Sequence, residues 1–187
     1  IYDSDDFLLN NGGFIYGTGR AFGIEAMLQY QTERLSLTAS YTYTDSRRRS
    51  DGVTYPFEYD VPHDFNAFVS YDVVKRPGRK HTFSLNVAWR SGLPYRLTNE
   101  SYPDTDGNPI IGITAYPTMR MHNYFRADVS YNMERRKRNG VRNWQFSIIN
   151  ATWHKNPVSI YPYRGSYKAT VLIPIMPSVS YTRTFGK

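Results

Sequence analysis

The sequence predicts an all-β protein whose strands form part of a transmembrane antiparallel β-barrel. Three observations support this prediction: residues alternate between apolar and polar, the alternating segments are long, and the connections between them are alternately short and long. In residues 35–43, every second residue is apolar or aromatic, and the residues between them are Ser or Thr. Side chains of a β-strand point to opposite faces in turn, so this strand has one apolar face and one polar face.

Seven segments alternate in this way along the chain. They span residues 20–31, 35–44, 63–73, 81–91, 124–134, 142–153 and 168–185. The seventh has the weakest pattern, because Pro174 and Pro177 interrupt it and proline cannot donate a hydrogen bond to a neighbouring strand. Strands of about 10–12 residues, at roughly 3.3 Å per residue and a tilt of about 45°, span about 25–28 Å, which matches the hydrocarbon core of a membrane.

The two faces of each strand follow from this alternation. The predicted lipid-facing residues are Phe22, Ile24, Ala26, Leu28 and Tyr30 in the first segment, Leu35, Leu37, Ala39, Tyr41 and Tyr43 in the second, Phe65, Ala67, Val69, Tyr71 and Val73 in the third, Phe83, Leu85, Val87 and Trp89 in the fourth, Phe125, Ala127, Val129, Tyr131 and Met133 in the fifth, and Trp144, Phe146 and Ile148 in the sixth. Five charged residues are predicted to face a watery lumen: Glu25, Asp72, Arg90, Arg126 and Asp128.

The connections predict the orientation of the strands. Residues 32–34, 74–79 and 135–141 are short connections, whereas residues 45–62, 92–123 and 154–167 are long ones. Outer-membrane barrels have short periplasmic turns and longer extracellular loops. The first segment is therefore expected to descend from outside, and the seventh to end in the periplasm.

Composition fits a barrel better than a helical membrane protein. Hydrophobic residues make up 40% of the chain, and no run of about 18 apolar residues exists, which excludes transmembrane helices. The aromatic share of 16%, with 17 Tyr, fits the aromatic girdles of barrels. The chain has no Cys, which excludes disulfides, thiolate metal sites and Cys nucleophiles.

Seven strands cannot close a pore-sized barrel, and lipid does not accept an open sheet edge. We therefore expect partner strands, either upstream of Ile1 or on another chain. The first residues carry no signal peptide, which predicts that the sequence is a fragment, a cleaved half or a separately encoded piece.

Several segments, in chain order, resemble TonB-dependent outer-membrane receptors. They are the glycine-rich residues 17–25, residues 59–65 at a strand start, residues 89–95 at an outward strand end, the Arg-x-Asp segment 126–130, residues 150–157, and the final segment 177–185. The resemblance implies a 22-stranded barrel, of which residues 1–187 would be about seven C-terminal strands, with an N-terminal plug domain that is not present in this chain. Gly186 and Lys187 after the final aromatic residue, and Arg183 on the lipid face, depart from the family pattern.

The resemblance also implies a function. Such a receptor imports a scarce nutrient across the outer membrane of a Gram-negative bacterium, powered by the TonB complex, and needs neither enzymatic activity nor a cofactor. The implied partners are the rest of the barrel and the plug, the TonB complex, outer-membrane lipid and lipopolysaccharide, and a surface lipoprotein. Phe185 would be the assembly signal at the end of the terminal strand.

The long connections are rich in Tyr and Arg, which offer stiff contact area and cation–π partners. The predicted ligand contacts are Tyr55, Tyr59, Tyr95, Arg96, Tyr102, Tyr116, Tyr161, Tyr163 and Arg164. The alternative for these residues is packing within loops or the interfacial girdle.

The sequence gives weaker support to three other kinds of site: a dinucleotide site, a metal site formed by His residues, and a calcium loop. Residues 17–23 superficially match a dinucleotide fingerprint, but a strand and not a helix follows them. The four His residues lack metal-ligand spacing, so no metal site is expected. Residues 104–109 alternate as in a calcium loop, but Gly107 stands at the wrong position and no Glu closes the loop, so we predict a turn and leave calcium binding open.

The net charge of +7 lies largely in the basic runs 47–49 and 135–138. Basic runs can bind nucleic acid. Because both runs fall in predicted turns or loops, we expect them to flank a membrane and contact anionic headgroups, with no nucleic-acid partner. Two alternatives to the receptor remain open at this point: a non-TonB outer-membrane barrel such as a porin or an adhesin, and a soluble all-β binding module.

Overall fold

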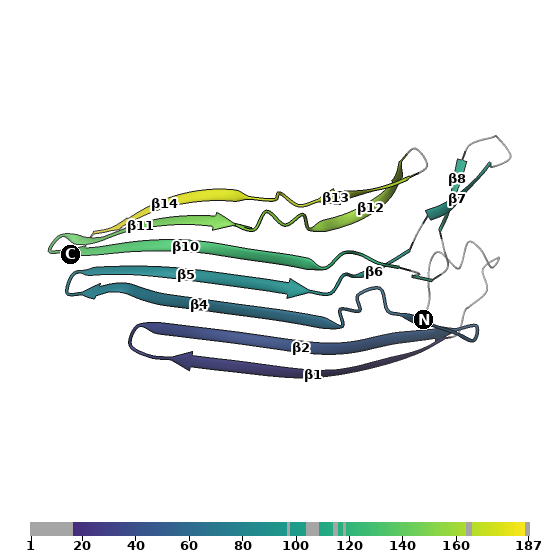
Figure 1. The fold of residues 1–187 in the computed structure, drawn as a ribbon, viewed down its shortest axis with the longest axis horizontal. Helices are drawn as coiled ribbons and strands as arrows, with labels where there is room; N and C mark the ends of the chain where they lie inside the picture. Colours follow the sequence, from purple (N-terminus) through teal and green to yellow (C-terminus); the bar gives the residue numbers. More distant parts are fainter. Residues whose placement is uncertain are drawn as a thin grey trace.

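The structure is a computed structural model, and it describes residues 17–96, 98–103, 109–113, 116–117, 119–163 and 166–185. The described residues form an all-β fold of antiparallel sheets. The main sheet contains, in spatial order, β1 (Gly17–Gln31), β2 (Leu35–Ser50), β4 (His63–Arg76), β5 (Arg79–Arg90), β10 (Tyr124–Lys137), β11 (Gly140–Ile149) and β14 (Met176–Thr184) (Figure 1). The short strand β3 (Val53–Pro56) continues the sheet at the end of β2.

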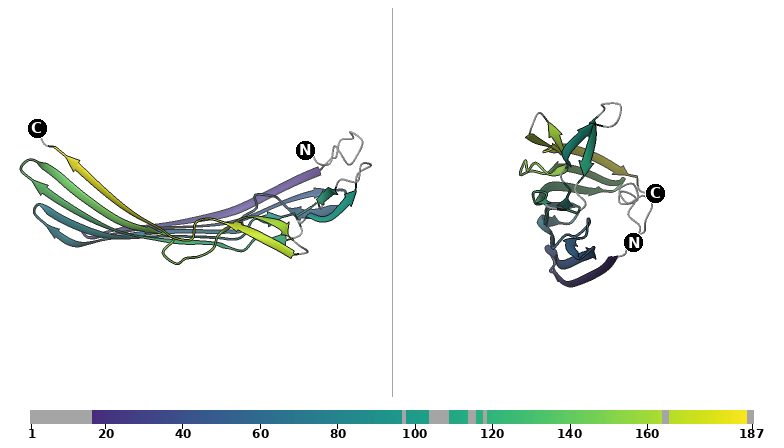
Figure 2. Two further views of the ribbon diagram at one scale, coloured as in Figure 1. Left: turned by 90° about the horizontal axis from the view of Figure 1, so that it is seen from above. Right: turned by 90° about the vertical axis from the view of Figure 1, so that its right-hand side faces the viewer.

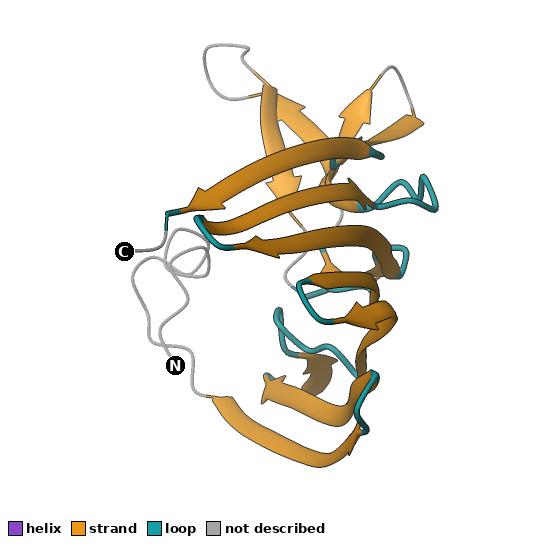
Figure 3. Ribbon diagram, turned by 90° about the vertical axis from the view of Figure 1, so that its left-hand side faces the viewer, coloured by secondary structure: helices purple, strands orange, loops and turns teal. Residues whose placement is uncertain are grey.

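The main sheet is curved and open, and it is not a closed barrel. Seen along the strands, the ribbons follow an arc whose two ends stay apart (Figures 2 and 3). The edge strands β1 and β14 each pair with one neighbour, β2 and β11 respectively. The far edge of each of these strands is therefore left without a sheet partner among the described residues.

Long and short connections lie at opposite ends of the main sheet. Tight turns join β1 to β2, β4 to β5 and β10 to β11 at one end, on the left in Figure 1. The small hairpins β7–β8 and β12–β13 lie at the other end, on the right. Pro77 and Gly78 form the two-residue β4–β5 turn, and Gly78, with φ of +71°, takes the left-handed conformation that favours glycine at the second position of the turn. The predicted alternation of short and long connections is confirmed.

The register sorts side chains onto two faces, as the alternation predicts. Leu37 lies opposite Val69, which lies opposite Leu85, which in turn lies opposite Val129. On the opposite face, Thr38, Phe68, Asn86 and Asp128 form the neighbouring row in the same way. In the first row, apolar residues therefore meet across three consecutive strand pairs, and a shift of one residue would mix the two faces.

The sheet is a single layer with almost no core. Ala127, at 8% exposure, is the one buried hydrophobic side chain in the part of the chain that the structure describes. The accessible surface of 13683 Å² greatly exceeds the roughly 9,200 Å² expected for a compact monomer of 21.7 kDa. Ile24 and Phe22 on β1 are 61% and 56% exposed. The described residues therefore leave the apolar side chains of the sheet largely exposed.

The first five predicted strands differ from the observed bounds by extension or by a few residues at an end, and the sixth and seventh differ most. The sixth, predicted over residues 142–153, ends at Ile149, because Asn150 takes a φ of +53° and turns the chain back. The seventh, predicted over 168–185, is two strands: β13 (Ser166–Val171) pairs with β12 (Pro157–Tyr163), and only β14 joins the main sheet. Pro174 lies in the break between them, as its lack of an N–H donor explains.

The predicted long loops also contain strands. β2 runs six residues past the predicted end at residue 44, and Asp51 and Gly52, both with positive φ, turn it into β3. The connection 92–123 holds the pairs β6 (Pro94–Tyr95) with β9 (Met119–Arg120), and β7 (Thr98–Pro103) with β8 (Pro109–Ile113). Of the predicted 104–109 turn, residues 104–108 lie outside the described residues.

The alternation at the end of the third predicted strand is interrupted. Val73 is the extra residue of a β-bulge, since Asp72 pairs with Thr82 and Val74 pairs with His81. The alternation Tyr71, Val73 cannot reveal this shift, because the adjacent Val74 is equally apolar.

The described residues contain no helix of the length and apolarity needed to cross a membrane.

Candidate functional site

The apolar face of the main sheet carries two rows of aromatic side chains. The loop-side row consists of Tyr41, Phe65, Trp89 and Phe125, which follow one another across β2, β4, β5 and β10. The turn-side row consists of Tyr71, Phe83, Tyr131 and Phe146, across β4, β5, β10 and β11. The two rows are six residues apart, or roughly 20 Å along the strand.

Only small and aliphatic side chains fill the band between the two aromatic rows on these central strands. The first inner row is Ala39, Ala67, Val87 and Ala127, and the second is Leu37, Val69, Leu85 and Val129. Aromatic girdles on both sides of an aliphatic band are the pattern of a lipid-facing barrel wall. A soluble sheet packed on a core has no reason to separate rings from aliphatic groups in this way.

Polar atoms within the aromatic rows have partners of their own. Tyr41 Oη lies 2.7 Å from Nδ1 of His63, and Tyr131 Oη lies 2.9 Å from Nδ1 of His81. His63 also stacks on Trp89, with ring centroids 6.2 Å apart. These contacts satisfy polar atoms at both margins of the band and leave the aliphatic centre free of them.

The opposite face is polar, and the five residues predicted to face a lumen all lie on it by register. Arg126 pairs with Asp128 at 2.8 Å, and Asp128 also accepts from the Asn150 backbone N–H at 2.9 Å. Asp72, only 6% exposed, accepts from Thr82 Oγ1 at 2.8 Å.

The remaining two predicted lumen residues are less constrained. The Arg90 guanidinium lies 4.7 Å from the Tyr124 ring centroid, and Glu25 is exposed on β1. A hollow of about 260 Å³ opens on this face, lined among others by Asp64, Asn86, Arg90 and Arg126. Such a wet, charged face cannot lie against lipid without a large cost.

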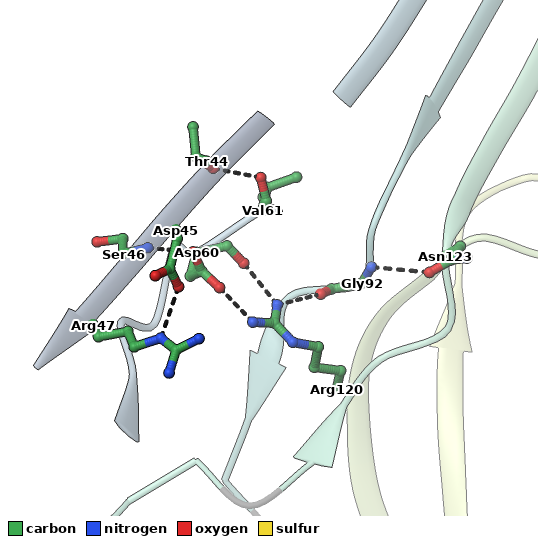
Figure 4. Close-up of polar contacts among 9 residues, drawn as sticks. All are labelled: Thr44, Asp45, Ser46, Arg47, Asp60, Val61, Gly92, Arg120 and Asn123. Atoms are coloured by element: carbon green, nitrogen blue, oxygen red, sulfur yellow. Dashed lines mark hydrogen bonds and ion pairs between the residues drawn. The ribbon is translucent and has the colours of Figure 1, made fainter. Parts of the chain in front are cut away.

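A buried ion pair ties the long connections together at the loop end (Figure 4). The Asp60 carboxylate, 3% exposed, pairs with Arg120 and accepts from the Ser46 N–H at 2.8 Å. Arg120 also donates to the backbone oxygens of Asp60 and Gly92 at 3.0 and 3.2 Å. One side chain from β9 thus binds both the 51–62 connection and the end of β5. We call Asp60 and Arg120 the loop clamp.

Charged groups surround a hollow of about 310 Å³ beside the loop clamp. Its lining includes Asp45, Arg47, Tyr55 and Arg120. The hydrogen bond from Arg47 Nε to Asp45, at 2.7 Å, lowers the pKa of the Asp45 carboxyl from its ordinary value and raises the pKa of Arg47. Asp45 is thereby held in its charged form to lower pH, and the hollow keeps fixed charges of both signs.

The structure gathers some of the predicted ligand contacts and separates others. Tyr55 and Tyr116 pack together with ring centroids 4.4 Å apart, and Arg96 pairs with Glu58 at 2.8 Å. Tyr59 is 72% exposed.

Further along the chain, Tyr95 Oη donates to the Ile160 backbone oxygen, which joins β6 to β12. On β12, Tyr161 is 44% exposed and Tyr163 has the Lys168 ammonium 3.7 Å from its ring centroid. The side chain of Tyr102 and the whole of Arg164 lie outside the described residues.

Sequence reasoning missed a second anchor, formed by Asn150 and Asn156. Asn156, 2% exposed, accepts from the Phe125 N–H at 2.8 Å and donates to the Phe125 oxygen at 2.9 Å. Its side chain thus replaces the strand partner that β11 does not supply there, since β11 pairs with β10 only from Val129 onward. Buried Asn in an irregular stretch gives no periodic signal, so only the positions of the strands reveal it.

Among the residues that the structure describes, no group of three or more His, Asp or Glu side chains is placed to hold a metal ion. Comparison with models of protein families, with characterised proteins and with solved structures finds no match for this chain.

Proposed function

We propose that this chain is about seven strands of the wall of a TonB-dependent outer-membrane receptor, which imports a scarce nutrient across the outer membrane of a Gram-negative bacterium. The observation that carries the membrane part of the proposal is the aliphatic band between two aromatic rows on one face of a single-layer sheet. The opposite face, with Asp72, Arg126 and Asp128, would line the watery lumen.

Hydrocarbon is the solvent that best fits the apolar face. Ile24, Leu28 and Phe22, each more than half exposed, belong to a face that runs unbroken over seven strands. Soluble monomers rarely expose contiguous apolar patches of more than a few hundred Å². In a membrane the same face needs no protein cover, which explains why the described chain builds no core on it.

The open edges support a larger assembly. Backbone N–H and C=O groups along the far sides of β1 and β14 have no strand partner among the described residues. Unpaired backbone groups cost several kcal/mol each in lipid, so barrels close their edges. The remaining strands, which the family resemblance puts at a total of 22, would therefore complete the wall.

The transport role follows from the family resemblance of segments such as 126–130 and 177–185, and from the loop end. The hollow beside the loop clamp and the pair Tyr55–Tyr116 offer aromatic and charged groups to a ligand approaching from outside. A plug domain and the TonB complex, both implied by the resemblance, would supply gating and energy.

Single cysteines test the membrane part, because the natural chain has none. Leu37→Cys and Val87→Cys should resist a water-soluble thiol reagent in intact membranes, whereas Thr38→Cys and Asn86→Cys, on the opposite face, should react. Equal reaction on both faces would overturn the wall assignment.

Uptake tests the transport part. Cells carrying the protein should accumulate its radiolabelled nutrient, drawn from iron chelates, cobalamin, peptides and glycans, and an uncoupler that collapses the inner-membrane proton gradient should abolish accumulation. Passage that persists with the uncoupler would assign a porin, and adhesion without any uptake would assign an adhesin; either result overturns the receptor proposal while leaving the wall in place.

A further inference from the structure

Five arginines stand directly side by side at the turn end of the apolar face. Arg76 lies opposite Arg79, Arg79 opposite Arg135, Arg135 opposite Arg142, and Arg142 opposite Arg183. The row crosses β4, β5, β10, β11 and β14 without interruption, and all five side chains are exposed. We call these residues the arginine row.

Such a row is unfavourable without counter-charge. Like charges directly opposite each other on neighbouring strands destabilise a sheet. Among the described residues, none of the five forms an ion pair. Glu134, the nearest acidic neighbour in sequence to Arg135, points to the opposite face by register and lies 3.9 Å from Arg136. The row therefore presents uncompensated positive charge to its surroundings.

The position of the row relates it to the membrane face. One step inward on the same face lie His81, Met133, Trp144 and Tyr181, which are adjacent to the turn-side aromatic row. The rings of Trp144 and Tyr181 are 4.6 Å apart. Aromatic side chains of this kind mark the boundary between hydrocarbon and headgroups, so the next residues outward lie at headgroup level.

Two hollows adjoin the row. One of about 340 Å³ is lined by Arg79, Arg135 and Arg142 together with Trp144, and Glu134 is the one acidic residue in its lining. The other, of about 350 Å³, is lined by Arg142, Arg183 and residues of the β10–β11 turn. Each hollow is therefore lined by at least two arginines of the row. The hollow that Arg79 lines also borders the ring of Trp144.

We propose that the arginine row binds the phosphates of anionic phospholipids in the leaflet at the short-turn end. A guanidinium holds phosphate through two parallel hydrogen bonds, and the row uses Arg at every one of its five positions. By contrast, the lysines of the β4–β5 hairpin lie on the opposite face, where Lys75 stands directly across from Lys80 in the strand register. The inference rests on the proposed function, since it requires the apolar face to meet lipid.

The ligand is a lipid phosphate and not a free phosphate ion because of what lies beside the row. A phosphate at Arg135 and Arg142 has Trp144 and Tyr181 next to it, and beyond them the aliphatic band. A headgroup with acyl chains can contact all of these at once. Inorganic phosphate would gain only the arginines, which remain exposed to competing water and salt.

The test uses the full chain, purified with the polypeptide that pairs with its edge strands, in phosphatidylcholine vesicles. Either phosphatidylglycerol or phosphatidylcholine with brominated acyl chains is added. The chain has three Trp, so the quenching that is present in the natural protein and lost in its Trp144→Phe variant reports the lipid beside Trp144. We expect brominated phosphatidylglycerol to quench at several-fold lower mole fraction than brominated phosphatidylcholine. Arg135→Gln and Arg142→Gln should each weaken the apparent affinity for phosphatidylglycerol roughly fivefold.

Matched controls are Lys75→Gln and Arg136→Gln, which remove the same charge at the same end but on the polar face. They should leave the preference intact. Three results would each overturn the proposal. They are an equal loss in the controls and the row variants, equal quenching by the two lipids, and displacement of phosphatidylglycerol by an equal concentration of inorganic phosphate. Quenching by either lipid would still support the wall assignment. Absence of quenching by both lipids would overturn the proposed membrane function as well.

Discussion

At the scale of single residues, a few buried polar side chains hold the loop end in place. Asp60 and Asn156 are 3% and 2% exposed, and each satisfies backbone groups of a segment distant in sequence. Buried polar groups cost free energy when left unpaired, so their partners are fixed as firmly as core contacts would be. Because the sheet has almost no core, these buried polar contacts hold the connections in position.

The loop clamp should respond unequally to loss of its two members. Arg120→Gln leaves a buried carboxylate with one backbone partner, and should cost roughly 3 kcal/mol in the free energy of unfolding. Asp60→Asn leaves a guanidinium that is 36% exposed and that water can reach, so it should cost less, roughly 1–2 kcal/mol. Urea unfolding in detergent micelles measures both.

The control for the loop clamp is Arg20→Gln, whose ion pair with Asp45 is exposed and 3.5 Å long. This variant should unfold almost as the natural protein does, because exposed pairs contribute little. Equal costs for Asp60→Asn and Arg120→Gln would mean that burial of the carboxylate does not determine the strength of the clamp.

Asn156→Ala should remove two hydrogen bonds to the Phe125 backbone and leave both groups unpaired, at a cost of roughly 2–3 kcal/mol. Hydrogen exchange of the Phe125 amide should accelerate, which locates the effect. Lys155→Ala, the exposed neighbour in the same segment, should leave both measurements unchanged. If the Phe125 amide stays protected in Asn156→Ala, another group completes the edge of β10.

At the scale of the strand, register determines which side chains share a solvent. Leu37 is flanked by Tyr30 and Val69, and Thr38 by Gln29 and Phe68. Adjacent residues of one strand thus belong to opposite faces of the sheet, one apolar and one polar. The same reasoning explains the β-bulge at Val73, which restores Val74 and Arg76 to the apolar face after one extra residue.

Arginine substitutions should separate the two faces by energy. Leu37→Arg or Val87→Arg, at the centre of the aliphatic band, should cost about 2–4 kcal/mol and impair assembly in the membrane. Thr38→Arg or Asn86→Arg, on the polar face, should be tolerated better, since water can solvate the charge. Folded yield in outer-membrane fractions measures the difference, and similar losses on both faces would contradict the assignment.

At the scale of the whole molecule, the sheet is incomplete. Among the described residues it is a single curved layer with two free edges, and its accessible surface of 13683 Å² is about half as large again as the roughly 9,200 Å² that a compact monomer of this mass would expose. A long, exposed and partly apolar edge such as β1 is a template for pairing with another strand. The proposed function therefore requires both lipid and further polypeptide in the native structure.

Hydrogen exchange across β1 should report that partner. In the assembled protein the amides of both edges of Gly17–Gln31 should be protected, because a strand pairs on each side. In the isolated chain about every second amide of β1 should exchange quickly, while β2, paired on both sides, stays protected. Fast exchange of the outer β1 amides in the assembled protein would show that this edge is free.

The sequence alone determined most strands of the main sheet and their two faces, because alternation with period two is a local property. The segments around Leu37, Val69, Val87 and Val129 have the predicted faces, and the short connections lie at one end. The candidate ligand contacts were predicted as separate residues, and the grouping of two of them into the Tyr55–Tyr116 pair depends on how two loops meet.

Only the tertiary structure decided which side chains meet across different strands and loops. The arginine row joins Arg76 to Arg183 over more than a hundred residues of sequence, and the loop clamp joins Asp60 to Arg120. Neither has a sequence signal, since the spacing between partners depends on the register and on the lengths of the hairpins between them. The break between β13 and β14 likewise depends on contacts outside the main sheet. β13 pairs with β12, the Leu172 N–H donates to the Asn156 oxygen, and the chain joins the main sheet again only at Met176.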